Sequence, residues 1–303
     1  MLDWLTSIQF PDGGYQGGHI RSEPRVPVTF NTGQILLGLA SGVTEFGEVY
    51  AEAMSRAGNW LVDTQDADGC WRKYPTPFAS PGEKAYETHV AWGLFEAARV
   101  GPESRFVGAA IANIRWALRY QRDNGWFDNC CLTDPLHPLT HTLGYVLRGI
   151  LEAYRYTEEP IYLRAAQRTA DAVVKTVRDD GYLPGRLTAD WTPAVSWVCL
   201  TGSAQIAHCL LMLHAWTGEF RYLRAALSLN RFVRRTILLT GPQELRGAVK
   251  GSYPIDGAYG AFEFLDWACK FMIDANVLEH EVTQQSSATP HLSGLRNEVA
   301  PNQ

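Results

Sequence analysis

The sequence has no apolar run of 18 or more residues, and no basic segment followed by a short apolar one near its start. The first absence argues against a membrane-spanning helix and the second against a secretory leader. The six cysteines are unevenly spaced, which does not suit a disulfide scaffold and favours a reducing compartment. We therefore expect a cytoplasmic protein without a membrane span.

Motifs for nucleotide chemistry are also missing. Neither the phosphate-binding loop nor the dinucleotide-binding glycine pattern occurs in the 303 residues, and the net charge of −5 argues against nucleic acid as a partner. His137 and His141 have a spacing found in metal sites, but Pro138 between them breaks the helical geometry that such a pair needs. We expect no metal and no cofactor.

What the sequence does contain is a repeat. A polar turn centred on glycine recurs at Gly13, Gly69, Gly125 and Gly181, each 56 residues after the last, and Gly241 follows 60 residues later. An aromatic residue follows most of these turns, and apolar residues hold fixed offsets before them. A period of this length indicates an architecture in which each unit packs on its neighbours.

Each repeat predicts two helices. The segment before each turn has apolar residues three and four apart and charges on the other face, which is typical of an outer helix packed on one side. The segment after each turn is more apolar and indicates an inner helix. Besides a short first outer helix, the predicted outer helices are 49–65, 105–121, 161–178 and 221–237, and the inner ones are 32–41, 87–98, 142–154, 202–216 and 259–275.

Short connections follow the inner helices, and connections of about 18 residues follow the outer ones. In an array of antiparallel hairpins this alternation places all the long loops at one end. We predict an all-α fold, an α/α toroid of five to six helical hairpins, as one domain over 1–277 with a polar tail over 278–303. The last inner helix is expected to close against the first outer one. Whether a sixth hairpin precedes residue 1 stays open.

The turn sequences resemble those of the terpenoid-cyclase and protein-prenyltransferase toroids. The resemblance is carried by residues 65–71 (Gln-Asp-Ala-Asp-Gly-Cys-Trp), 121–126 (Gln-Arg-Asp-Asn-Gly-Trp) and 11–18 (Pro-Asp-Gly-Gly-Tyr-Gln-Gly-Gly). It is a resemblance of scaffold, since the acidic Asp-x-Asp-Asp motif of the class II cyclases and a zinc-binding Asp/Cys/His set are both absent.

A second resemblance concerns residues 197–207, 250–260 and 266–271. These stretches resemble VpsJ-like bacterial proteins found with polysaccharide biosynthesis functions. This resemblance implies a glycan context but supplies no catalytic residues. Related α/α toroids include uronic-acid epimerases, polysaccharide lyases and unsaturated-uronide hydrolases.

Aromatic residues alternate with Arg and Lys in the long loops. Aromatic rings stack on the apolar faces of sugars, and Arg binds a carboxylate through two hydrogen bonds, so this pattern suits a sugar acid. Aromatic residues at repeat positions equally suit packing under the turns, as for Trp71, Trp126 and Tyr182. The candidate substrate-binding residues are Trp71, Trp126, Tyr182, Arg186, Trp191, Trp197, Arg246, Lys250 and Asp256.

Candidate acids and bases lie where the inner helices begin. Glu87 and His89 start one inner helix, where a carboxylate equally suits the helix dipole. His141 starts the next inner helix, and Tyr259 starts the last one with Glu263 one turn further. Burying a carboxylate inside a toroid costs free energy unless the group is ion-paired or serves a function, so we favour a function for Glu263. These five are the candidate catalytic residues.

We predict a carbohydrate-active enzyme with acid–base chemistry at the long-loop rim. The reaction would be removal of a proton next to a carboxylate, as in an epimerase or lyase, or glycoside hydrolysis by paired carboxyls. Two alternatives stay open: an isoprenoid-handling toroid, with Asp256 as the only nearby acid, and a non-catalytic glycan-binding scaffold. The partner would be a glycan or a small molecule, and the oligomeric state is undefined. His208 and His214 lie in apolar helical sequence and are expected to be core residues.

Overall fold

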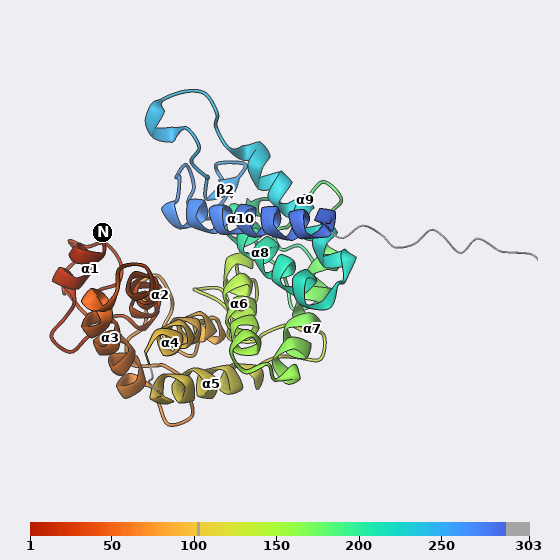
Figure 1. Cartoon of the computed structure of the whole chain (residues 1–303). Helices are drawn as coiled ribbons and strands as arrows, with labels where there is room; N and C mark the ends of the chain where they lie inside the picture. Colours follow the sequence, from red (N-terminus) through yellow and green to blue (C-terminus); the bar gives the residue numbers. More distant parts are fainter. Residues whose placement is uncertain (102–103, 289–303) are drawn as a thin grey trace, which may run out of the picture.

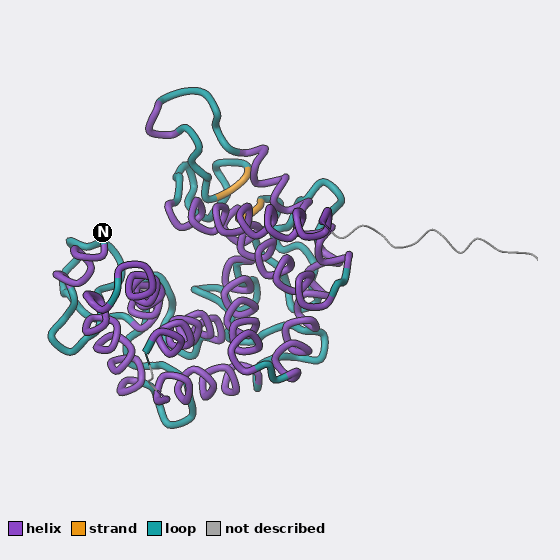
Figure 2. The backbone as a smooth tube through the Cα atoms, viewed as in Figure 1, coloured by secondary structure: helices purple, strands orange, loops and turns teal. Residues whose placement is uncertain are grey.

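The computed structural model describes residues 1–101 and 104–288. Within these ranges the chain is almost entirely helical, with one pair of short strands (Figures 1 and 2). Helices alternate between two layers, which confirms the all-α toroid. The outer helices are α1 (Leu2–Ile8), α3 (Ala51–Thr64), α5 (Ser104–Leu118), α7 (Pro160–Thr176) and α9 (Phe220–Thr236), and the inner helices are α2 (Thr29–Phe46), α4 (Thr88–Val100), α6 (Thr140–Thr157), α8 (Leu200–Thr217) and α10 (Asp266–Ala288).

The two layers differ in how much of each helix is buried. α8 buries almost every side chain between Leu200 and His214, because it packs on α6, α9 and α10. α9 buries one face only, with Tyr222, Ala225 and Leu229 three or four residues apart, and it exposes arginines on the other face. None of the described helices is long and apolar enough to cross a membrane.

Each of the first four glycine turns packs on the next outer helix. Gly69 and Gly125 have φ values of +94° and +85°, a left-handed conformation that glycine adopts with little strain. A β-carbon at Gly69 would collide with the backbone carbonyl of Ala112 in α5, and one at Gly125 would lie 2.5 Å from the carbonyl oxygen of Arg168 in α7. These turns therefore fix where each hairpin lies relative to the next.

A glutamine four residues before the glycine reinforces this contact. Gln65 Nε2 donates to the carbonyl oxygens of Gly69, at 3.1 Å, and of Ala109 in α5, at 2.9 Å. Gln9 and Gln121 donate in the same way to carbonyl oxygens of α3 and α7. The repeat thus carries its own link between neighbouring hairpins.

The long loops lie at one end of the molecule, as predicted, and each is hydrogen-bonded to the next. Backbone hydrogen bonds join Thr29 to Tyr74, Ala85 to Asn129, Thr140 to Gly185 and Leu200 to Gly251. The antiparallel strands β1 (Val198–Cys199) and β2 (Ser252–Tyr253) add a further link. All five inner helices therefore begin at this end, which is named the rim.

The ring is open. The inner helices pack in the order α2, α4, α6, α8, α10, and among the described residues no comparable packing joins α10 back to α1 or α2 (Figure 1). Gly241 has a φ of +107° like the other turn glycines, yet a β-carbon there would have nothing within 4 Å. The expected closure of the last inner helix against the first outer one is wrong, because the turn contacts fix the angle between hairpins and five hairpins do not complete a circle.

The last helix is longer than predicted and begins later, at Asp266 instead of residue 259, so the prediction that Tyr259 and Glu263 are helical is wrong: both lie in the loop before α10. α10 continues to Ala288, so residues 278–288 are helical rather than part of the polar tail. Leu278 packs on the hydrophobic core and Val282, one turn later, is buried, which explains the extension. The rest of the predicted tail lies outside the described residues.

Substituting two turn glycines separates conformational strain from packing. Gly125→Ala and Gly241→Ala both place a side chain at positive φ, which costs about 1 kcal/mol. Only Gly125→Ala adds a collision, with α7. We expect it to lower the free energy of unfolding by at least about 2 kcal/mol, against about 1 kcal/mol for Gly241→Ala, measured by chemical denaturation. Equal losses would contradict the turn-on-helix contact.

Candidate functional site

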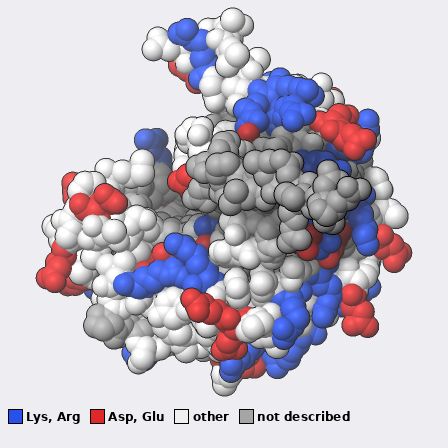
Figure 3. Space-filling model, turned by 45° about the vertical axis from the view of Figure 1, so that its right-hand side comes forward, with Lys and Arg blue, Asp and Glu red and all other residues white. Residues whose placement is uncertain are grey.

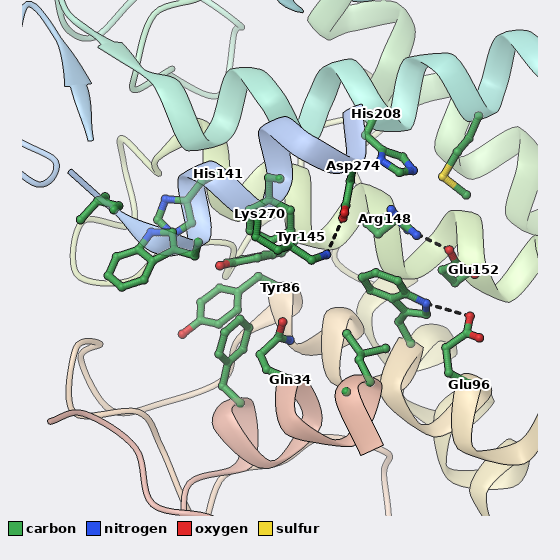
Figure 4. Close-up of a pocket in the computed structure, with 18 of the residues that line it drawn as sticks. Gln34, Tyr86, Glu96, His141, Tyr145, Arg148, Glu152, His208, Lys270 and Asp274 are labelled. Atoms are coloured by element: carbon green, nitrogen blue, oxygen red, sulfur yellow. Dashed lines mark hydrogen bonds and ion pairs between the residues drawn. The ribbon is translucent and has the colours of Figure 1, made fainter. Parts of the chain in front are cut away.

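A cavity of about 1270 Å³ lies between the five inner helices. All five contribute to its lining, and α2 and α10 border it on the open side of the ring. About half of the Lys270 side chain and about half of the surface of Trp267 are exposed. Both residues line the cavity, so it opens to solvent there. The lining residues fall into two groups along the ring axis (Figure 4).

The first group, named the rim half, consists of Tyr86, His141, Tyr145, Tyr259 and Glu263. His141 is the second residue of α6, and its ring centroid lies 4.7 Å from that of Tyr259 and 5.2 Å from that of Tyr145. Tyr86, His141 and Tyr145 lie near the starts of α4 and α6, and Tyr259 and Glu263 lie in the loop that leads into α10. The rim half therefore follows from the parallel inner helices.

His141 is neutral and has a free ring nitrogen. The side chain is buried, and its Nδ1 has no hydrogen-bond partner in the described structure. Burial, together with the smaller effect of the positive charge of Arg186, lowers the pKa of His141 to about 3. An unprotonated imidazole of this kind can accept a proton from a bound molecule.

The tyrosines of the rim half hold their protons. Burial raises the pKa of Tyr86, of Tyr145 and of Tyr259 well above the ordinary phenol value. Trp267 Nε1 donates to the hydroxyl oxygen of Tyr259 at 3.0 Å, which leaves the hydroxyl proton available for donation. The hydroxyl of Tyr86 is buried without a partner in the described residues.

The second group, named the basal half, consists of Trp92, Glu96, Arg148, Glu152 and His208, further along α4, α6 and α8. Arg148 Nε donates to Glu152 Oε1 at 2.8 Å, and its guanidinium lies 3.8 Å from the Trp92 ring centroid. Trp92 Nε1 donates to Glu96 Oε1 at 3.0 Å. These interactions fix the polar wall of the basal half.

His208 is a cavity residue, which corrects the expectation that it is a satisfied core histidine. Its Nδ1 is buried and has no partner among the described residues. Burial lowers the pKa of His208 well below the ordinary value, and the charges of Arg148 and Lys270 add to this. The repeat held a signal for it, because Trp92, Arg148 and His208 are 56 and 60 residues apart and occupy equivalent positions.

The predicted catalytic residues separate into two sets. His141, Tyr259 and Glu263 line the cavity. His89 is buried behind the lining, where its Nδ1 lies 2.6 Å from Gln34 Nε2. Glu87 is also buried and does not line the cavity, so neither His89 nor Glu87 is placed to touch a molecule bound there.

None of the predicted substrate-binding residues lines the cavity. The three aromatics at repeat positions are packing residues: Trp71 is buried and donates its indole N–H to the carbonyl of Leu61, Trp126 is buried, and Tyr182 packs on Phe232. Their expected position facing a substrate is corrected, because the glycine turn directs them into the wall.

The other two tryptophans also pack in the loops. Trp191 contacts the edge of Trp126, with ring centroids 5.3 Å apart, and donates its indole N–H to the carbonyl of Asn124. Trp197 packs so closely on Gly185 that a β-carbon there would collide with its ring. Trp191 thus packs on the preceding long loop and Trp197 within its own loop, and neither lines the cavity.

The charged members of the predicted set are directed elsewhere as well. Arg186 donates to the carbonyl of His137 at 2.6 Å, and Lys250 Nζ donates to the carbonyl of Thr236 at 2.6 Å. Arg246 is exposed in the loop between α9 and β2, which projects from the body (Figure 1), and Asp256 is exposed outside the cavity. The cations that were expected to bind a sugar acid are therefore not in the cavity.

No family model matches the sequence, and no curated protein sequence matches it either. Its structure is similar to an unsaturated glucuronyl hydrolase specific for heparin, with a TM-score of 0.71 and 13% identity over 86% of this chain and 76% of that one. It is also similar to cellobiose 2-epimerase from Bacillus thermoamylovorans (TM-score 0.71, 11% identity, 95% and 80% covered) and to D-mannose isomerase (TM-score 0.70, 14% identity, 94% and 81% covered). At these identities the similarity shows the fold. The resemblances to VpsJ-like proteins and terpenoid cyclases stay predictions.

The buried Glu87 predicts a pH dependence of stability. Burial raises its pKa from the ordinary 4.5 to about 8, against the opposing charge of Lys84. Between these values the folded protein keeps a proton that the unfolded chain has lost, so the contribution of Glu87 to stability falls as pH rises through this window. Glu87→Gln removes that loss. We expect the melting temperature of the variant, relative to the parent, to rise from about pH 5 to about pH 8.5. A constant difference would show that Glu87 ionises normally.

Proposed function

We propose that the protein is a carbohydrate-active enzyme that transfers a proton on a sugar bound in the rim half, as an epimerase or isomerase does. The observation that carries the proposal is His141, a neutral and unpartnered imidazole held between Tyr145 and Tyr259 at the wall of a large open cavity. The same site combines a proton acceptor, proton donors and aromatic faces.

A sugar suits this lining. The aromatic rings of Phe30, Tyr86 and Trp267 border the rim half and offer apolar faces on which a sugar ring stacks. Phenol hydroxyls, the amide of Gln34 and the carboxylate of Glu263 offer hydrogen-bond partners for sugar hydroxyls.

The reaction would begin when the unprotonated ring nitrogen of His141 accepts the proton from the carbon beside the sugar carbonyl. The C–H electron pair forms a carbon–carbon double bond, and the carbonyl oxygen takes up the negative charge. The hydroxyl of Tyr259 or Tyr86 donates a hydrogen bond to that oxygen and stabilises it. Return of the proton to the same carbon, after the intermediate has turned its other face to His141, and with the double-bond electrons going back to the carbonyl, gives the epimer. Return of the proton to the former carbonyl carbon gives the isomer; the former carbonyl oxygen is then protonated, and the hydroxyl on the first carbon loses its proton and becomes the new carbonyl.

Hydrolysis by a pair of carboxyls fits less well. Such a pair needs two carboxyls about 5 to 9.5 Å apart. Of the carboxylates that line the cavity, Glu96 and Glu152 are ion-paired to Arg155. Glu263 and Glu281 have no ion pair among the described residues, but Glu263 lies in the loop before α10, whereas Glu281 lies 15 residues into that helix, about 22 Å along its axis at 1.5 Å per residue.

The isoprenoid alternative is disfavoured by the same lining. An isoprenoid site would be a sealed aromatic pocket, whereas this cavity is open and carries five carboxylates and three cations. The names of similar structures also support a carbohydrate, since they include an epimerase, an isomerase, a hydrolase, a mannanase and a polysaccharide lyase.

Solvent deuterium tests this function directly. The parent, incubated in D₂O with free reducing monosaccharides and disaccharides, should incorporate deuterium at the carbon next to the carbonyl, as followed by NMR. His141→Gln should lower the rate at least about 100-fold, since it removes the proton acceptor. His137→Gln is the control, because His137 is paired with Asp134 and does not line the cavity. Release of new reducing ends without deuterium would instead identify a hydrolase.

A further inference from the structure

We infer that the substrate is an uncharged oligosaccharide chain that lies along the ring axis, with its reacting sugar in the rim half and further sugars in the basal half. This inference rests on the proposed function. It names the substrate class and adds binding positions remote from the proton transfer.

The cavity is longer than one sugar. On α6 the lining residues run from His141 to Arg155, 14 positions or about 21 Å at 1.5 Å per residue. On α8 they run from His208 to Trp216, near the end of the helix. A sugar placed between His141 and Tyr259 therefore leaves the basal half free for more of the chain.

The basal half has the features of a sugar-binding position. His208 presents a buried ring nitrogen without a partner, a group whose burial costs free energy unless a ligand or water binds it. Figure 4 shows His208 on the same side of the cavity as Arg148 and Glu152. Trp216, which is 36% exposed, adds an aromatic surface, and Trp92 is held in place by Arg148 and Glu96.

The cations that line the cavity are all neutralised. Arg148 and Arg155 pair with Glu152 at 2.8 and 3.2 Å, and Lys270 pairs with Asp274. A guanidinium that is already paired gains little by binding a second carboxylate. On the surface of Figure 3, Lys and Arg likewise lie beside Asp and Glu instead of forming one basic face.

The remaining charges in the cavity are negative. Glu263 and Glu281 line it near its two ends without an ion pair in the described structure, so a chain of uronates would meet repulsion at both ends. The cations predicted to bind a sugar acid, Arg186, Arg246 and Lys250, do not line the cavity. These charges favour a chain without carboxylates.

Calorimetric titration with two ladders of oligosaccharides tests the inference. One ladder is uncharged and the other consists of uronates, each from one to six sugars long. Affinity of the parent should rise at least tenfold from the shortest to the longest uncharged sugar. His208→Ala and Trp216→Ala should each remove most of this gain. His214→Ala is the matched control, since His214 lies on α8 but does not line the cavity.

The outcomes separate the inference from the proposed function. A gain with length that His208→Ala or Trp216→Ala abolishes, with no deuterium exchange on any sugar, would support the inference and refute the proton transfer. Deuterium exchange on single sugars with no gain in affinity along the uncharged ladder would support the proton transfer and overturn the inference. Tighter binding of the uronate ladder would overturn it as well.

Discussion

The structure depends on one repeated contact, the seating of a glycine turn on the backbone of the next outer helix. The turn can approach this closely only because glycine has no side chain and adopts a positive φ. A glutamine before the turn donates to the same helix. These contacts orient every hairpin alike, so all five inner helices are parallel and start at the rim.

Parallel inner helices explain why chemistry converges on the axis. Residues at equal depth in different helices face one another, although they are 50 or more residues apart in the chain. His141 and Tyr259 meet near the helix starts, and Trp92, Arg148 and His208 meet two turns further along. The two halves of the cavity are thus two levels of the same repeat.

The sequence predicted what the repeat governs. Helix order, the shared position of the long loops and the cavity position of His141 follow from register, whereas Tyr259 and Glu263 line the cavity from the loop before α10 and not from the helix predicted for them. The direction of the loop side chains does not follow from register. Trp71 and Arg186 were therefore assigned to a substrate, although Trp71 donates to the carbonyl of Leu61 and Arg186 to that of His137. His208 was missed because its apolar neighbours indicate a core helix, and only its repeat position, equivalent to Arg148, marks it as facing the axis. The open ring depends on the angles between hairpins, and no pattern of residues in the sequence predicts these angles.

In the part of the chain that the structure describes, the open ring leaves α2 and α10 without extensive packing across the gap. Among the described residues they are linked around the ring through contacts between successive hairpins, which include the inner-helix interfaces α2–α4, α4–α6, α6–α8 and α8–α10. Each repeat packs mainly on its neighbours, so a small rotation at one interface adds to those at the others, as in linear repeat proteins. The distance across the mouth of the cavity then depends on the sum of these small rotations. In a closed toroid these rotations would have to cancel around the circle, and the mouth would have a fixed width.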